Sequence, residues 1–203
     1  CAAGTYQDES GQKICKSCEE GSFCPEGAAA PLPCKQGSYS RATNLTSAAE
    51  CTPTAPGFYA STGSTQQAAC SPGTVAPSAS MGACVVCLSG SYQPTEGATA
   101  CETCGLGVYC AAGASAELSC PAGRYQPSRG AAEPAADCQI TPPGTYASAG
   151  SAAPSNCPNA TFNTQAGSEE VGACLRCQEY STSPAGSTEQ AACVCDPPRL
   201  LLG

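Results

Sequence analysis

Apolar side chains in this chain gather in short clusters that recur at a regular interval. Most clusters are a Gly-x-aromatic triplet: Gly4-Thr5-Tyr6, Gly21-Ser22-Phe23, Gly37-Ser38-Tyr39, Gly57-Phe58-Tyr59, Gly90-Ser91-Tyr92, Gly107-Val108-Tyr109, Gly123-Arg124-Tyr125 and Gly144-Thr145-Tyr146. Weaker members are Gly73-Thr74-Val75, Ala160-Thr161-Phe162 and Glu179-Tyr180. From Gly4 to Ala160 the interval is 16 or 17 residues and stretches to 20 or 21 at two junctions. Each cluster therefore marks one block of a tandem repeat.

Every block predicts the same local structure. Gly, Pro, Ser and Thr interrupt each segment, so no window keeps the 3.6-residue period of a helix. We expect a short extended segment around the aromatic residue, a Gly-containing turn, and a return strand toward the next cysteine. The glycine before the aromatic residue is expected to supply a positive φ or a close approach to the neighbouring block. All eight tyrosines take the aromatic position, and we expect the rings to bury most of a small core against a disulfide or an adjacent block.

Composition shows what has to hold such blocks together. Leu, Ile, Val and Phe number only 20 of 203 residues, with no Trp and one Met, whereas there are 19 cysteines. A chain so poor in large apolar residues cannot fold on a hydrophobic core alone. A disulfide that closes a loop of about 15 residues stabilises a fold by roughly 3 kcal/mol. The sequence therefore predicts a small disulfide-rich fold, mostly irregular with short β-hairpins, arranged as an elongated ladder of tandem repeats.

A longer repeat lies over the short one. The cysteines at 1, 15, 18, 24, 34 and 51 recur at 87, 101, 104, 110, 120 and 138, an offset of 86 or 87 residues. Cys70 and Cys84 then correspond to Cys157 and Cys174, with three extra residues between the second pair. We therefore predict a first copy over residues 1–86, a second over 87–176, and a partial third copy over 177–203.

The simplest disulfide scheme closes each block on itself. The pairs in this scheme are Cys1–Cys15, Cys18–Cys24, Cys34–Cys51, Cys70–Cys84, Cys87–Cys101, Cys104–Cys110, Cys120–Cys138, Cys157–Cys174 and Cys177–Cys193. Eight cysteines allow 105 pairings, and an overlapping scheme with Cys18–Cys34 and Cys24–Cys51 stays open. Cys195 has no mate. Because a free exposed thiol does not persist outside the cell, we expect its partner downstream in a longer parent chain or on a neighbouring subunit.

Four cysteines have a spacing that also fits other chemistry. Cys84-x-x-Cys87 and Cys101-x-x-Cys104 match a zinc ribbon, and each Cys-x-x-Cys is a potential redox dithiol. The same pattern is one phase of a repeat that covers the chain, and the chain has no histidine. A redox pair also needs a helix N-terminus to depress the thiol pKa, and the sequence predicts none. We therefore interpret these cysteines as structural and expect no metal site and no cofactor.

Charge and residue content exclude several function classes. The net charge is −8, and the eight Lys and Arg residues are scattered singly, so the chain lacks the basic patch that nucleic acids and anionic lipid surfaces require. Without histidine, a clustered carboxylate pair or a phosphate loop, the sequence favours no enzyme and no catalytic residue. The apolar end RLLLG, residues 199–203, is too short for a membrane span.

Two features place the chain outside the cell. So many disulfides need an oxidising compartment. Asn44-Leu45-Thr46 and Asn159-Ala160-Thr161 are N-glycosylation sequons, so Asn44 and Asn159 are expected to be exposed glycan acceptors. We expect a secreted or cell-surface protein that carries covalent glycans.

The stretches CEEGSFCPEGAAAPLPCKQGSYS (residues 18–40) and CGLGVYCAAGASAELSCPAGRYQ (residues 104–126) carry a resemblance. They resemble the cysteine-rich ephrin-receptor-like repeat, which is related to EGF and tumour-necrosis-factor-receptor modules, and the resemblance covers almost the whole chain. It implies no catalytic residues. Long arrays of this repeat are typical of large secreted or surface proteins of algae and other protists, including those of flagellar hairs (mastigonemes), and the Ala-rich filler here is similar to green-algal proteins of that kind. The blocks at Gly57 and Gly144 depart from the pattern because each lacks a leading cysteine.

Two functions remain. The first is an extracellular structural protein: a stiff, glycosylated, disulfide-laddered rod that self-assembles into filaments or belongs to a longer parent chain, because tandem copies repeat the same contact surface. The second is a ligand-binding ectodomain, the stalk of a receptor or adhesin. The second hypothesis predicts an exposed patch that breaks the repeat.

Overall fold

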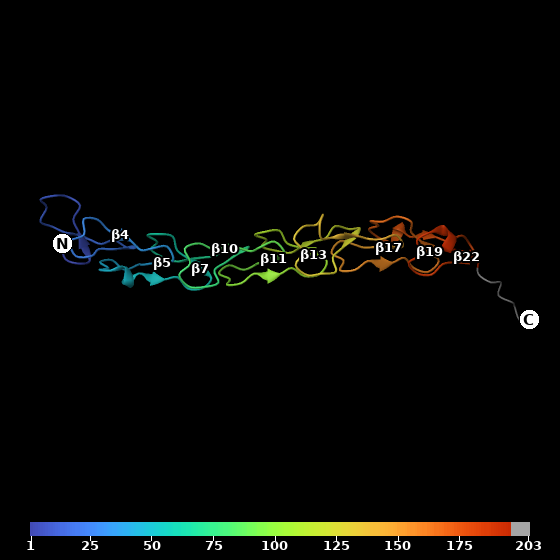
Figure 1. Cartoon of the computed structure of the whole chain (residues 1–203), viewed down its shortest axis with the longest axis horizontal. Coiled ribbons are helices and arrows are strands. Elements are labelled where there is room, and N and C mark those ends of the chain that lie inside the picture. Colours follow the sequence, from blue (N-terminus) through green and yellow to red (C-terminus); the bar gives the residue numbers. More distant parts are fainter. Residues whose placement is uncertain (196–203) are drawn as a thin grey trace, which may run out of the picture. The chain divides into compact units, whose positions relative to one another are not determined.

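The computed structural model describes residues 1–195. The end of the predicted third copy, including the RLLLG stretch, lies outside these described residues. By its internal contacts the chain divides into two units: Cys1–Cys87 with Gln93–Glu102 and Gly113–Ser115, and Leu88–Tyr92 with Thr103–Ala112 and Ala116–Gly203. Each unit is built from the same kind of β-hairpin, and in each the hairpins follow the order of the sequence (Figure 1).

Eleven antiparallel hairpins, each of two two-residue strands, make up the secondary structure of residues 1–195. The first five pair β1 (Thr5–Tyr6) with β2 (Lys16–Ser17), β3 (Ser22–Phe23) with β4 (Leu32–Pro33), β5 (Ser38–Tyr39) with β6 (Thr52–Pro53), β7 (Phe58–Tyr59) with β8 (Ala68–Ala69), and β9 (Thr74–Val75) with β10 (Val85–Val86). The next three pair β11 (Ser91–Tyr92) with β12 (Glu102–Thr103), β13 (Val108–Tyr109) with β14 (Leu118–Ser119), and β15 (Arg124–Tyr125) with β16 (Gln139–Ile140). The last three pair β17 (Thr145–Tyr146) with β18 (Ser155–Asn156), β19 (Thr161–Phe162) with β20 (Leu175–Arg176), and β21 (Ser181–Thr182) with β22 (Val194–Cys195).

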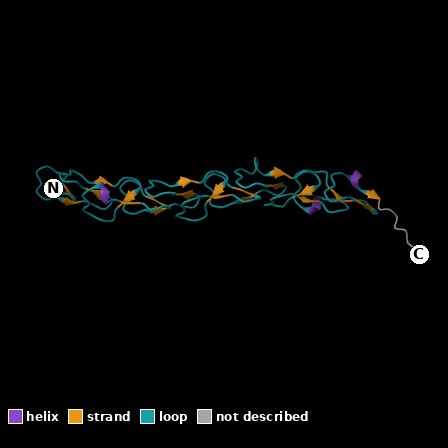
Figure 2. Cartoon of the chain, turned by 60° about the horizontal axis from the view of Figure 1, so that its bottom comes forward, coloured by secondary structure: helices purple, strands orange, loops and turns teal. Residues whose placement is uncertain are grey.

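Helical structure is confined to three single 3₁₀ turns among the described residues: η1 (Ala48–Glu50), η2 (Val171–Ala173) and η3 (Gln190–Ala192). Loops and turns make up most of the chain, as Figure 2 shows. This architecture confirms the predicted disulfide-rich, mostly irregular fold with short hairpins in tandem.

Each hairpin and its loop form one block, which begins at the residue that follows the previous return strand. Blocks 1 to 11 are residues 1–17, 18–33, 34–53, 54–69, 70–86, 87–103, 104–119, 120–140, 141–156, 157–176 and 177–195. The first residue of a block, here called its leading residue, is a cysteine in nine blocks and a threonine, Thr54 or Thr141, in two. The residue at the aromatic position pairs with the first residue of the return strand, as Phe23 does with Leu32.

A repeated set of backbone contacts joins each block to the next two blocks. In block 4, the Gly57 N–H donates to the Ala76 carbonyl at 2.8 Å, and the Gly57 carbonyl accepts from the Cys70 N–H at 3.0 Å. The Cys70 carbonyl in turn accepts from the Gly97 N–H of block 6 at 2.9 Å. The same bonds recur around Gly123 in the other unit, with Thr141 in place of the cysteine. Because blocks 1 to 9 all repeat them, the loops satisfy their backbone polar groups without long strands.

These contacts bring the glycine of each triplet directly against a backbone carbonyl two blocks on. A Cβ atom built on the nine glycines from Gly4 to Gly144 would lie 2.0–2.6 Å from that oxygen, closer than any side chain tolerates. The partners, in order, are Asn44, Gly63, Ser80, Gly97, Gly113, Gly130, Gly150, Gly167 and Gly186. All nine glycines also have positive φ, so both roles that the sequence predicts for this glycine are fulfilled together.

Two blocks lack the glycine, and one of them corrects the sequence prediction. Ala160 takes the glycine position in block 10 with φ 61°, and Tyr180 takes it in block 11 with φ 60°. Tyr180 was expected at the aromatic position, but Thr182 holds that place, opposite Val194. In blocks 1 to 9, the glycine at this position contacts a backbone carbonyl two blocks later. Blocks 10 and 11 have no such later block within residues 1–195, so no described carbonyl excludes a side chain at Ala160 or Tyr180. Tyr180 is 84 % exposed.

The core consists mainly of half-cystines, and the prediction that aromatic rings would bury most of it is wrong. Eleven cysteines are buried, whereas the tyrosines at the aromatic position are only half-buried. Phe162 is the exception, at 8 % exposure. The rings lie on two-residue strands whose partner strands are almost entirely exposed, so one face of each ring has no second layer to pack against.

Candidate functional site

The disulfides close the blocks, and each bridge lies within a single block. The structure joins Cys1–Cys15, Cys18–Cys24, Cys34–Cys51, Cys70–Cys84, Cys87–Cys101, Cys104–Cys110, Cys120–Cys138, Cys157–Cys174 and Cys177–Cys193, with Cα–Cα distances of 5.6 to 6.2 Å. These are the pairs of the simplest scheme, and the overlapping pairs Cys18–Cys34 and Cys24–Cys51 do not occur. Seven bridges link the leading cysteine to the end of its hairpin loop, and Cys18–Cys24 and Cys104–Cys110 span only six residues.

The four cysteines with zinc-ribbon spacing are divided among three bridges. Cys84 pairs with Cys70, Cys87 pairs with Cys101, and Cys104 pairs with Cys110. Across residues 1–195, no group of three or more His, Cys, Asp or Glu side chains has an arrangement that would hold a metal ion. The Cys-x-x-Cys pattern therefore arises because the last cysteine of one block stands just before the leading cysteine of the next.

The two blocks without a disulfide carry a buried threonine at the leading position. Thr54 and Thr141 are 1 % and 0 % exposed. The Thr141 hydroxyl donates to the carbonyls of Gly123 at 3.2 Å and Ser168 at 3.4 Å. The Thr54 hydroxyl instead accepts from the Met81 N–H at 3.0 Å. Sequence reasoning noted the missing cysteines but did not find these substitutes, because a hydroxyl that bonds across blocks leaves no local pattern.

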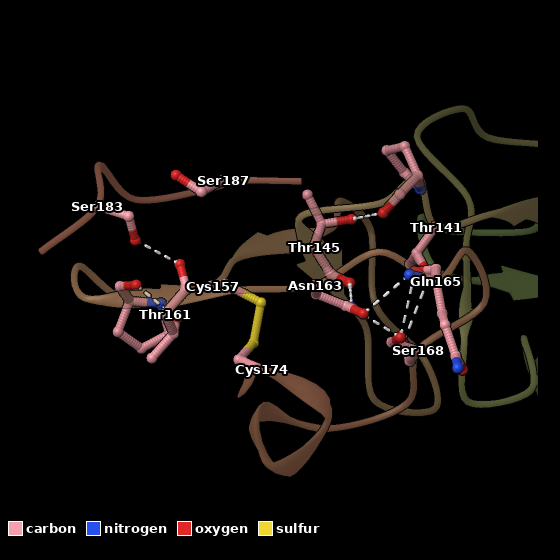
Figure 3. Close-up of a disulfide and its surroundings, with 12 residues drawn as sticks. Thr141, Thr145, Cys157, Thr161, Asn163, Gln165, Ser168, Cys174, Ser183 and Ser187 are labelled. Carbon is pink, nitrogen blue, oxygen red and sulfur yellow. Dashed lines mark hydrogen bonds between the residues drawn. A yellow bond between two sulfur atoms is a disulfide. The ribbon is translucent and has the colours of Figure 1, made fainter. Parts of the chain in front are cut away.

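Polar side chains after the aromatic position tie neighbouring blocks together. In Figure 3, Asn163 donates through Nδ2 to the Thr145 carbonyl of block 9 at 3.2 Å and to the Ser168 hydroxyl at 2.8 Å. Ser183 of block 11 donates to the Thr161 carbonyl of block 10 at 2.7 Å. No buried side-chain oxygen or nitrogen in the described residues lacks a partner, so these buried polar groups cost little and fix the spacing of the blocks.

Cys195 is the free cysteine of residues 1–195, and it is exposed. It ends β22, opposite Ser181. This register makes Cys195 the second residue of the return strand, equivalent to Ser17 opposite Thr5 in block 1. In most earlier blocks the leading cysteine comes one residue later. The structure thus leaves Cys195 without an intramolecular partner among the described residues.

The two sequon asparagines are both exposed but occupy different places. Asn44 lies at the turn of block 3 with φ 61°, and its backbone N–H donates to the Cys18 carbonyl at 2.9 Å. The sequon hydroxyl of Thr46 donates to the Glu50 carboxylate. Asn159 lies before β19, and the hydroxyl of Thr161 donates to the Pro158 carbonyl at 2.6 Å. Neither sequon asparagine is buried by its own block.

Charged groups with shifted pKa values are few and lie at the surface. Asp8 and Lys16 form an ion pair at 2.6 Å; its hydrogen bond lowers the pKa of Asp8 and raises that of Lys16. The hydrogen bond from Thr46 lowers the pKa of Glu50. Backbone N–H groups of Glu133 and Ala132 lower the pKa of Asp137. These shifts come from loop hydrogen bonds and ion pairing, not from a pair of groups poised for acid–base chemistry.

An open groove of about 580 Å³ lies on block 10. Its lining residues are Pro158, Asn159, Ala160, Thr161, Val171, Gly172, Cys174 and Arg176. Figure 3 shows the Cys157–Cys174 disulfide, which joins the start of the block that carries Thr161 to the loop of η2. The extra length of this loop is visible in the sequence, since block 10 has three residues more than block 5 between the two cysteines.

Comparison with known families assigns one segment. Residues 73–117 match the family described as tyrosine-protein kinase ephrin type A/B receptor-like. No curated protein matches the chain. The matched segment holds the bridges Cys87–Cys101 and Cys104–Cys110, which supports the predicted ephrin-receptor-like repeat. Cysteine-rich domains of this type are generally non-catalytic.

Together these observations indicate an extracellular, disulfide-rich domain. Nine disulfides among residues 1–195 require an oxidising environment, and the family match is to a receptor-type ectodomain module. None of the helices in the described residues has the length and apolar character needed to span a bilayer.

Proposed function

We propose that this chain is a segment of a non-enzymatic extracellular structural protein, a stiff glycosylated rod within a fibre or a cell-surface appendage such as a flagellar hair. The observation that supports this most is the contact of each triplet glycine with a carbonyl two blocks on. A repeat whose blocks interlock over three neighbours resists bending, since any bend must break backbone bonds in several blocks at once. The exposed return strands leave room for a coat of glycans on Asn44 and Asn159.

Extension of the array is part of the proposal. At the end of the described chain, block 11 has a residue with positive φ at the glycine position, whose counterparts in earlier blocks donate their N–H to the following block. It also has an unpaired cysteine, Cys195. We propose that a further block, from a longer parent chain or a neighbouring subunit, covers this end and pairs with Cys195. Head-to-tail contacts that do not close into a ring generate helical fibres.

Electron microscopy of the native material tests the proposal, and filaments are the expected result. The isolated chain gives a second measure by small-angle scattering. A compact 203-residue protein has a radius of gyration of about 17 Å, and a rod should return a value well above it. A value near that of a compact protein, or native material seen as single compact particles, would reject the rod.

Cys195 provides the test of extension. Non-reducing electrophoresis and peptide mapping of native material should find Cys195 in a disulfide with another segment or another chain. A soluble monomer in which Cys195 is a free thiol would remove the main support for the fibre.

A ligand-binding ectodomain is the second candidate, because residues 73–117 match a receptor-type family and block 10 carries an open groove. Arg124 and Arg129 lie close together in the sequence, but they support ligand binding less. Arg124 donates to the Cys138 carbonyl at 2.6 Å within its own block, so this guanidinium already has a structural partner. Single particles by microscopy, with a saturable partner that loses affinity when the groove is altered, would favour this candidate.

A further inference from the structure

Block 10, which carries the groove, differs from its equivalent in the first copy, although blocks 3 and 11 also have long loops that contain a 3₁₀ turn. In the first copy, the equivalent bridge Cys70–Cys84 spans 14 residues, whereas Cys157–Cys174 spans 17. The extra length contains η2, whose Val171 and Gly172 form one wall of the groove. Block 5 also has Pro72 where block 10 has Asn159. Block 5 therefore lacks both the three additional residues and the sequon. The groove and the glycosylation signal occur in the same block.

The sequon itself lines this groove. Asn159 and Thr161, its first and third residues, are both lining residues. Thr161 lies directly opposite Arg176 in the pair of β19 and β20, so the Arg176 side chain starts from the same face of the hairpin as Thr161. Val171, another lining residue, is 50 % exposed and offers an apolar surface. The groove thus combines an attachment point, an apolar wall and one cationic donor.

We propose that this groove seats the proximal sugars of an N-linked glycan on Asn159. A sugar ring has an apolar face, formed by its C–H groups, that packs on aliphatic side chains, and its hydroxyl and acetamide oxygens accept hydrogen bonds. Val171 and Pro158 supply the apolar contact, and the five N–H donors of Arg176 supply the polar one. Covalent attachment at the groove edge holds the sugars at high local concentration, so weak contacts suffice. This inference rests on the glycosylation in the proposed function.

Asn44 serves as the internal comparison. It lies in block 3, which contributes no residue to the groove. Its backbone is held by the Cys18 carbonyl and its carbonyl faces Gly4, while its side chain is exposed. A glycan at Asn44 should therefore project freely into solvent.

The experiment measures how fast an amidase that cleaves N-glycans releases each glycan from the native, secreted chain. Glycopeptide mass spectrometry first establishes occupancy at both asparagines. A groove that holds the glycan for nine-tenths of the time should slow release at Asn159 about tenfold relative to Asn44, because only the unseated fraction is accessible. The difference should vanish after denaturation. Arg176→Ala and Val171→Glu should each raise the native rate at Asn159 and leave the rate at Asn44 unchanged.

Arg129→Ala is the matched control, since Arg129 is an exposed arginine of block 8 outside the groove; it should change neither rate. A disulfide map of every variant establishes that the fold is retained. An unoccupied Asn159 would reject the glycosylation as well as the groove. An occupied Asn159 released as fast as Asn44, with no effect of Arg176→Ala or Val171→Glu, would reject the groove alone.

Discussion

Gly57 lies so close to the Gly97 carbonyl that a Cβ atom on Gly57 would stand 2.0 Å from that oxygen. The φ of Gly57 is +84°, and its own carbonyl is bonded to Cys70, whose carbonyl receives the Gly97 N–H. The contact is therefore backbone against backbone, with no flexible side chain to move aside. Glycine at this position is required by packing as well as by conformation.

This geometry predicts that Gly57→Ala is more destabilising than alanine at a glycine with positive φ alone. Gly27 is the control, with φ +75° and no atom within 4 Å of an added Cβ. We expect Gly27→Ala to cost about 1–2 kcal/mol of unfolding free energy, the penalty of left-handed backbone. We expect Gly57→Ala to cost about 1–3 kcal/mol more, the penalty of overpacking. Denaturant unfolding of the two variants measures the difference, and equal losses would contradict the close approach.

The two leading threonines are predicted to differ when their hydroxyls are removed. Thr54→Val leaves the Met81 N–H without its acceptor, and an unsatisfied donor costs about 1–3 kcal/mol. Thr141→Val removes only a hydrogen-bond donor. The Gly123 and Ser168 carbonyls stay satisfied, because they still accept from the backbone N–H groups of Thr141 and Ala147. The expected loss of unfolding free energy is about 0.5–1.5 kcal/mol. Unfolding free energies rank the two variants. A larger loss for Thr141→Val would show that these bonds are assigned the wrong way round.

The loop of block 8 is predicted to loosen in acid. Asp137 accepts N–H bonds from Ala132 at 2.6 Å and Glu133 at 3.0 Å, which lower its pKa. A carboxyl with a folded pKa below its unfolded value stabilises the loop fully above the unfolded pKa of about 3.9, and this contribution disappears as the pH falls through the folded pKa. Carbon-13 titration should place the Asp137 midpoint below that of a model peptide.

Amide exchange gives the second readout for this loop. The Ala132 and Glu133 amides should lose protection as Asp137 is protonated, and Asp137→Asn should remove that pH dependence. A titration midpoint at or above the ordinary carboxyl value would contradict the prediction.

Loop length should rank the disulfides in stability. Cys34–Cys51 and Cys18–Cys24 are both buried, but they span 17 and 6 residues. On the chain-entropy account, the Cys34→Ala/Cys51→Ala variant should lose about 3 kcal/mol and the Cys18→Ala/Cys24→Ala variant about 2 kcal/mol. Thermal unfolding of the double variants tests this order, and the reverse order would indicate that packing of the sulfur atoms outweighs loop closure. Mapping of the unreduced wild-type chain should return the nine pairs within blocks.

The sequence alone predicted the block and its closure. The Gly-x-aromatic spacing located every first strand from Thr5 to Phe162, and the excess of cysteines over large apolar residues predicted a fold held by bridges. These features are local: a bridge that spans 14 to 18 residues closes the hairpin that contains it, so its signal stays within one block. The insertion in block 10 was also visible, though not the groove that it forms.

Only the tertiary structure decided which residues of different blocks contact one another. Tyr180 was assigned to the aromatic position because it is a tyrosine at nearly the right interval, whereas its φ of 60° places it at the glycine position. Thr54 and Thr141 take the leading position in the two blocks that lack a leading cysteine. Their hydroxyls bond to residues 18 to 27 positions away, so the sequence near each threonine does not reveal this role. The pairing of Gly57 with Gly97 depends on how three successive blocks stack. Such contacts join backbone atoms across some 40 residues, and since every residue has the same backbone groups, no side-chain pattern specifies which of them meet.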